Sequence, residues 1–134
     1  MRKIEHIGIA VQDIEASNEL FAKIFGKESY KSESVESESV ITSFFQVGES
    51  KIELVTATNQ NSPIAKYLDK NRQGMHHIAF DVEDIKAEMK RLKAEGIRTL
   101  SDLPNQGADN KLICFLHPKD TNGVLIELCQ EIAG

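Results

Sequence analysis

Residues 5–17 read Glu-His-Ile-Gly-Ile-Ala-Val-Gln-Asp-Ile-Glu-Ala-Ser, and residues 76–88 read His-His-Ile-Ala-Phe-Asp-Val-Glu-Asp-Ile-Lys-Ala-Glu. The two stretches align at an offset of 71 residues, which places His6 on His77 and Asp13 on Asp84. Each has the pattern of a strand, a helix N-cap and the first turn of a helix. One repeat at about half the chain length predicts two equivalent halves, because solenoids repeat shorter units at least three times.

The first half has a clear order of predicted elements. A strand over residues 4–11 is followed by a helix that Asp13 caps and Gly26 ends. Residues 31–39 are polar and fit either a hairpin strand or a loop, whereas 40–47 and 51–56 read as a strand pair around a turn. The predicted apolar stripe of the helix comprises Ile14, Leu20, Phe21, Ile24 and Phe25.

The second half repeats this order. Ser62 and Pro63 predict the start of a short helix that runs to about Asn71. A strand over 75–82, a helix over 84–95 and strands over 112–117 and 124–130 follow. We therefore expect an α+β protein of two tandem βαβββ modules in a single domain over residues 1–134. Module one spans about 1–58, a connecting helix segment about 59–73, and module two about 74–134.

Strand parity adds two glutamates to the two histidines. Glu53 lies between Ile52 and Leu54, and Glu127 lies between Ile126 and Leu128, so each glutamate faces away from its apolar neighbours. His6 and His77 have the same relation to the isoleucines that follow them. Each half thus supplies one imidazole and one carboxylate.

These four residues predict a metal site. A lone glutamate or histidine on a strand is usually a surface or packed residue, but the same pair in both halves favours ligands that meet across a pseudo-two-fold axis. The ligand set suits Mn, Fe, Co, Ni or Zn better than Ca or Mg. His76 faces away from His77 and is expected to pack, and Cys129 shares the parity of Glu127.

Composition excludes several classes of protein. The 134 residues carry a net charge of −5, which argues against nucleic-acid binding. The sequence contains no apolar run of the ~18–20 residues that span a membrane, and its N-terminus lacks the apolar region of a signal peptide. The two cysteines, Cys114 and Cys129, are too few for a disulfide scaffold. We expect a cytoplasmic protein.

The repeated His-Ile-x-x-x-Val-x-Asp-Ile unit, with a glutamate near the end of each half, resembles the vicinal-oxygen-chelate superfamily, which includes glyoxalase I and dioxygenases. The stretches 62–71, 74–78 and 115–128 are similar to those of the methylmalonyl-CoA epimerases within it. The resemblance covers nearly the whole chain. It implies a mixed sheet curved around a divalent metal, with ligands at His6, His77 and Glu127 and a fourth at Glu53. Some of these epimerases carry a catalytic glutamate at a position that falls near Thr42, and the strand 40–47 contains no carboxylate. Glu36 and Glu38 precede that strand.

The implied reaction is the interconversion of methylmalonyl-CoA stereoisomers through a metal-stabilised enolate. Inversion needs proton removal on one face and delivery on the other, and Glu127 is the predicted catalytic residue on one side. The predicted contacts of CoA phosphates are Lys119, Lys66 and Lys70. The alternatives are a glyoxalase-I-like lactoylglutathione lyase, whose ligand set is the same, and a non-enzymatic small-molecule-binding protein of this fold. We expect a homodimer.

Overall fold

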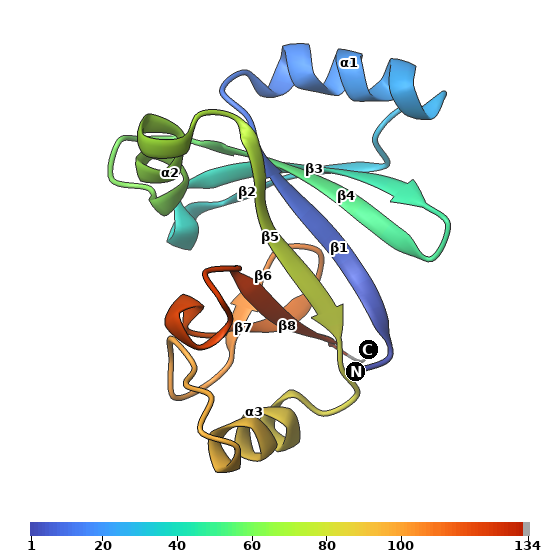
Figure 1. Ribbon diagram of the computed structural model, residues 1–134. Helices are drawn as coiled ribbons and strands as arrows, with labels where there is room; N and C mark the ends of the chain where they lie inside the picture. Colours follow the sequence, from blue (N-terminus) through green and yellow to red (C-terminus); the bar gives the residue numbers. More distant parts are fainter. Residues whose placement is uncertain (133–134) are drawn as a thin grey trace. The chain divides into compact units, whose positions relative to one another are not determined.

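The computed structural model describes residues 1–132. The chain forms two compact units, residues 6–76 and residues 1–5 together with the chain from 77 onward. Each half of the chain carries four strands (Figure 1). Each unit has its own hydrophobic clusters. The elements of the first half are β1 (Lys3–Ala10), α1 (Ile14–Phe25), β2 (Lys31–Val35), a 3-10 turn (Glu36–Glu38), β3 (Val40–Val47), β4 (Ser50–Ala57) and α2 (Pro63–Asn71).

The second half follows the same plan. Its elements are β5 (Gly74–Asp81), α3 (Ile85–Ala94), β6 (Asn105–Gly107), β7 (Lys111–Phe115), a 3-10 turn (Pro118–Asp120) and β8 (Ile126–Glu131). The strands lie in the order β1-β4-β3-β2 in the first half and β5-β8-β7-β6 in the second. In both halves the first two strands of this order are parallel and the remaining pairs are antiparallel. The predicted βαβββ plan is confirmed in each half.

The two principal helices begin in the same way. The Asp13 carboxylate accepts a hydrogen bond from the Ala16 amide at 3.1 Å, and the Asp84 carboxylate accepts one from the Ala87 amide at 3.1 Å. Each aspartate satisfies an amide that the first helical turn leaves unpaired. Gly26 ends α1 in the left-handed region at φ 71°, as its position predicted.

Helix α1 packs on one face of its sheet through fewer residues than predicted. Ile14, Phe21 and Phe25 contact the buried cluster that contains Phe45. Leu20 and Ile24 are 54% and 61% exposed, so their assignment to the buried stripe was wrong. At 3.6 residues per turn they lie about a quarter of a turn from the line through the other three.

Helix α2 covers the other face of the same sheet. Its Ile64 packs with Ala10, Val40 and Val55. Ser62 caps the helix, which ends at Asn71 as predicted. Side chains alternate across a strand, so Val55 lies on the face of Glu53, whereas Leu54 packs in the Phe45 cluster beneath α1. The site face of the first half is therefore the α2 face.

The strands of the second half also present two distinct faces. Helix α3 packs through Ile85, Met89 and Leu92 onto a cluster that includes Leu128. The opposite face carries Ala79, Ile113 and Cys129, with Phe115 against them.

The structure decides between the two alternatives for one strand and adds one strand that was not predicted. The polar segment 31–39 contains strand β2, which pairs with β3 from Lys31 to Val35. The short strand β6 was not predicted, because three residues of sequence Asn-Gln-Gly carry no apolar alternation. Its partner β7 supplies the pairing that holds it in the sheet.

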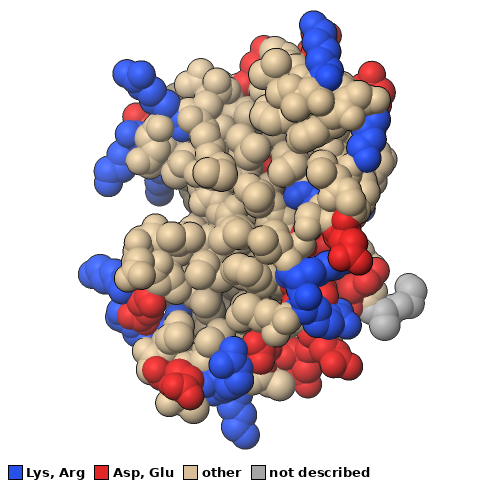
Figure 2. Space-filling model, turned by 45° about the vertical axis from the view of Figure 1, so that its right-hand side comes forward, with Lys and Arg blue, Asp and Glu red and all other residues tan. Residues whose placement is uncertain are grey.

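Within residues 1–132, none of the helices has the length and apolar character needed to cross a bilayer. Lys and Arg side chains are mixed with Asp and Glu over the face drawn in Figure 2. Cys114 and Cys129 are both buried free thiols.

Candidate metal centre

The first half brings His6 and Glu53 into contact. His6 Nε2 lies 3.4 Å from Glu53 Oε1, and the two side chains are only 7% and 8% exposed. They come from the parallel strands β1 and β4, in which Gly8 lies across from Glu53. Gly8 shares the face of His6 and adds no side chain beside the pair.

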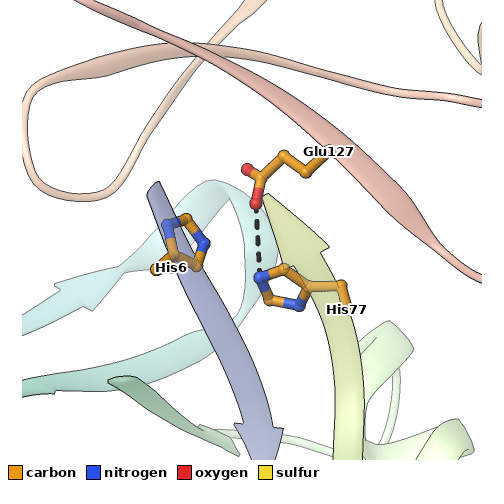
Figure 3. A group of neighbouring side chains, drawn as sticks. All are labelled: His6, His77 and Glu127. Atoms are coloured by element: carbon orange, nitrogen blue, oxygen red, sulfur yellow. Dashed lines mark ion pairs between the residues drawn. The ribbon is translucent and has the colours of Figure 1, made fainter. Parts of the chain in front are cut away.

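The second half repeats this arrangement with His77 and Glu127. His77 Nε2 lies 3.2 Å from Glu127 Oε1, and both side chains are 6% exposed. Figure 3 shows this contact as a dashed line, with His77 rising from β5 and Glu127 from β8. Ala79 lies across from Glu127 in the parallel register, two residues after the histidine, as Gly8 does in the first half. The smallest side chains thus stand beside both pairs.

An aromatic residue flanks each glutamate on its antiparallel neighbour. Phe44 lies across from Glu53, and Phe115 lies across from Glu127. The histidine-to-glutamate spacing is longer by three residues in the second half, 50 against 47. The two halves therefore have the same pairing although their spacings differ.

Burial restricts what these pairs can do. A carboxylate removed from water is costly unless a positive or hydrogen-bonding group compensates it. Each pair provides one imidazole nitrogen and one carboxylate oxygen, and both atoms are ligands for divalent transition metals. His6, His77 and Glu127 are all buried and each offers one such ligand atom.

Two neighbours lie as their parity predicted. The imidazole of His76 stands edge-on to the ring of Tyr67 at a centroid distance of 4.8 Å, and the Tyr67 hydroxyl donates to the Met75 carbonyl at 2.7 Å. His76 is thus a packed residue. Cys129 is fully buried beside Ala79 on the site face.

The three lysines named as phosphate contacts are all exposed. Lys66 and Lys70 lie on α2, and Lys119 lies in the 3-10 turn that precedes β8. The imidazole of His117 accepts a hydrogen bond from the Lys119 amide at 3.2 Å and so caps this turn.

Thr42 lies near the position to which the resemblance assigned a catalytic glutamate. It is buried, and Glu33 lies directly across from it in the β2–β3 register. Residues that face each other in an antiparallel pair point to the same side, so Glu33 is a carboxylate on the site face that the prediction missed. The alternation of Lys31, Glu33 and Val35 was the available signal. Glu36 and Glu38 lie beyond the strand, in the 3-10 turn.

Comparison with known proteins identifies the family. Residues 5–115 match the Glyoxalase/Bleomycin resistance protein/Dioxygenase superfamily. The chain belongs to this superfamily. Membership agrees with the two βαβββ modules and confirms the predicted fold class.

Several relatives within the superfamily are epimerases by name. The chain is 42% identical over 130 residues to an ethylmalonyl-CoA/methylmalonyl-CoA epimerase of Cereibacter sphaeroides, an alignment that covers 96% of this chain and 97% of the relative. A methylmalonyl-CoA epimerase solved in complex with methylmalonyl-CoA and NH4+ is 36% identical, with a TM-score of 0.95 over 99% of this chain and 96% of that one. The Mycobacterium tuberculosis methylmalonyl-CoA epimerase is 32% identical, with a TM-score of 0.93 over 97% and 88% of the two chains.

Proposed function

We propose that this protein is an isomerase that epimerises methylmalonyl-CoA by removing and returning the proton next to the thioester carbonyl. The observation that carries the proposal is the identical register of two buried histidine–glutamate pairs. The 42% identity to the Cereibacter sphaeroides epimerase over nearly the whole of both chains supports the choice of substrate.

The proposal includes one divalent metal held by His6, Glu53, His77 and Glu127. The donor set fits such an ion, because all four side chains are buried and offer nitrogen or carboxylate oxygen. A metal bound there would act as a Lewis acid toward substrate oxygens and stabilise negative charge on them. Mn, Fe, Co, Ni and Zn all suit these ligands.

The protein's own groups move the proton. Glu127 is the proposed acid/base group on one side of the reacting carbon, and its carboxylate oxygen takes or returns the proton. The burial of Glu127 and His77 excludes water from this position, which keeps the transferred proton from leaking to solvent. Inversion also needs a second group on the opposite face of the carbon, and Glu33 is our choice for it.

The same ligand set would serve a glyoxalase-I-like lyase, so two substrates must be compared. The decisive measurement is α-proton exchange from methylmalonyl-CoA in D₂O, followed by NMR on metal-loaded protein. We expect kcat/KM for methylmalonyl-CoA to exceed that for the methylglyoxal–glutathione hemithioacetal by at least about 10³, or roughly 4 kcal/mol of transition-state stabilisation.

Two outcomes would contradict the proposal. Turnover of the hemithioacetal without proton exchange would favour the lyase. Neither activity with Co, Ni, Mn or Zn would favour a binding protein of this fold. We also expect the protein to be a homodimer, which analytical ultracentrifugation would measure. We expect it in the cytoplasm, which cell fractionation would test.

A further inference from the structure

Strand β2 carries Glu33, the proposed second acid/base group, and is the outermost strand of the first half. Glu33 lies across from Thr42, and Lys31 lies across from Phe44. Phe44 in turn lies across from Glu53, so all of these side chains share the site face. Two strand spacings of about 4.8 Å separate β2 from β4, which places Glu33 beside the proposed metal ligands rather than among them.

The Glu33 carboxylate is held by an ammonium group. Lys31 Nζ lies 3.2 Å from Glu33 Oε1, and the two side chains are 39% and 31% exposed. An ion pair with this exposure adds little to stability, because water and salt screen it. It does restrict the Glu33 side chain, which would otherwise sample many rotamers. The main effect of Lys31 is therefore on the position of the carboxylate.

Two side-chain hydrogen bonds fix the backbone from which this carboxylate projects. The Thr42 hydroxyl donates to the Glu33 carbonyl at 3.3 Å, and the Ser32 hydroxyl donates to the Thr42 carbonyl at 3.1 Å. They reinforce an edge strand, which within residues 1–132 is paired on one side only. At the end of the strand, Val35 packs against the cluster that contains Ile64. The edge strand is thus fastened on both sides of Glu33.

We infer that Lys31 and Thr42 are positioning residues for the second acid/base group of the epimerisation. The Lys31 ammonium orients the Glu33 carboxylate, and the Thr42 hydroxyl holds the backbone beneath it. The inference rests on the proposed function, in which Glu33 serves one face of the reacting carbon. Positioning matters for this step, because a displacement of about 1 Å at a reacting group costs about 10²-fold in rate.

The test measures α-proton exchange in D₂O for each pure stereoisomer of methylmalonyl-CoA with metal-loaded protein. Lys31→Gln should slow exchange about tenfold for the stereoisomer that Glu33 serves, and exchange of the stereoisomer that Glu127 serves should stay within about twofold of wild type. Because inversion needs both groups, kcat should fall about tenfold in both directions with KM unchanged. Lys31→Arg keeps the charge and should restore exchange to within about threefold of wild type.

Matched variants separate positioning from stability. Arg91→Gln breaks another exposed ion pair, in which Arg91 Nε lies 3.0 Å from Glu88 Oε1 on α3, and it should leave both exchange rates unchanged. Lys31→Gln and Arg91→Gln should both melt within a few degrees of wild type. Thr42→Val keeps a branched side chain without the hydroxyl and should slow exchange of the same stereoisomer as Lys31→Gln. Thr42→Ser keeps the hydroxyl and should exchange both stereoisomers as wild type does.

An equal fall for both stereoisomers in Lys31→Gln, or no fall, would overturn the inference. So would a Lys31→Arg protein as slow as Lys31→Gln, or a loss for only one stereoisomer in Arg91→Gln. Unchanged exchange in Thr42→Val would refute the role of Thr42. If wild-type protein exchanged neither stereoisomer, the proposed function would fail and the inference with it. If wild type and Lys31→Gln exchanged both equally well, the proposed function would stand and only the inference would fail.

Discussion

The ring of Phe115 stands at 87° to the imidazole of His77, with the two centroids 5.9 Å apart. Phe115 also lies across from Glu127 in the β7–β8 register. One aromatic side chain therefore borders both members of the buried pair. Edge-to-face contacts of this kind contribute about 0.5–1.5 kcal/mol beyond the area they bury, so Phe115 helps to fix the orientation of the His77 ring.

Replacement of Phe115 should weaken metal binding without removing a ligand. For Phe115→Leu we expect the dissociation constant of Co²⁺ or Zn²⁺ to rise about fivefold, since about 1 kcal/mol of favourable ring contact that orients His77 is lost. The measurement is competition against a chromophoric chelator. Phe80→Leu, on the opposite face of β5, is the control and should leave the affinity unchanged. Equal weakening in both variants would indicate a general loss of packing.

The adjacent histidines of β5 should have different roles. His77→Ala removes a proposed ligand and should abolish tight metal binding and activity. His76→Ala removes a ring that packs on Tyr67 and should lower the melting temperature while metal binding persists. Metal content by mass spectrometry and thermal unfolding by circular dichroism measure the two effects. If both variants lost metal while folded, the assignment by strand parity would be wrong.

The repeat in the sequence predicted most of this fold for a physical reason. A strand, a capping aspartate and a helix are set by local patterns. The repeat of this pattern, with His6 and Asp13 in one copy and His77 and Asp84 in the other, therefore predicts two copies of one unit. Parity then placed these histidines together with Glu53 and Glu127 on the face opposite their apolar neighbours, because neighbours along a strand point to opposite faces. These are short-range rules, and the structure bears them out within each half.

The features that local patterns missed depend on partners distant in the sequence. Leu20 and Ile24 fit an amphipathic helix, but the sheet beneath α1 contacts only the side that carries Phe21 and Phe25. Strand β6 exists through its pairing with β7. Glu33 is one of several glutamates in a polar run of serines and glutamates. Only its pairing with Thr42 in the sheet shows that it is the glutamate of this run that lies on the site face.

Glu33 should be the second acid/base group of the epimerisation. Glu33→Gln is expected to lower kcat by about 10²–10⁴ with little change in KM, because general acid/base groups contribute on that scale. In D₂O the α-proton of only one stereoisomer should then exchange for deuterium, since Glu127 can still remove the proton from that stereoisomer. NMR of each pure stereoisomer measures this. Glu36→Gln and Glu38→Gln are the matched variants, and a one-sided loss in either of them would move the role to that residue.

The ion pair of Arg98 and Asp120 should make stability depend on acid pH. The Arg98 guanidinium donates to both oxygens of the Asp120 carboxylate at 2.9 and 3.0 Å, and these hydrogen bonds hold the pKa of Asp120 well below its usual range. A carboxylate whose folded pKa is lowered stabilises the native state above its unfolded pKa, near 3.9, and loses this contribution as the pH falls toward the folded value. Asp120→Asn should therefore lower the melting temperature at pH 7, and the gap to wild type should narrow below about pH 4.

Differential scanning calorimetry between pH 2.5 and 7 would measure this gap, on the order of a few degrees at most for an exposed pair. Asp102→Asn is the matched control, because Asp102 is exposed and makes no ion pair within residues 1–132, and it should follow wild type throughout. A gap for Asp120→Asn that stayed constant down to pH 2.5 would show that the neutral side chain, rather than the charge, supports the turn. The turn Pro118–Asp120 precedes β8, so loss of the pair should also loosen the backbone that leads to Glu127.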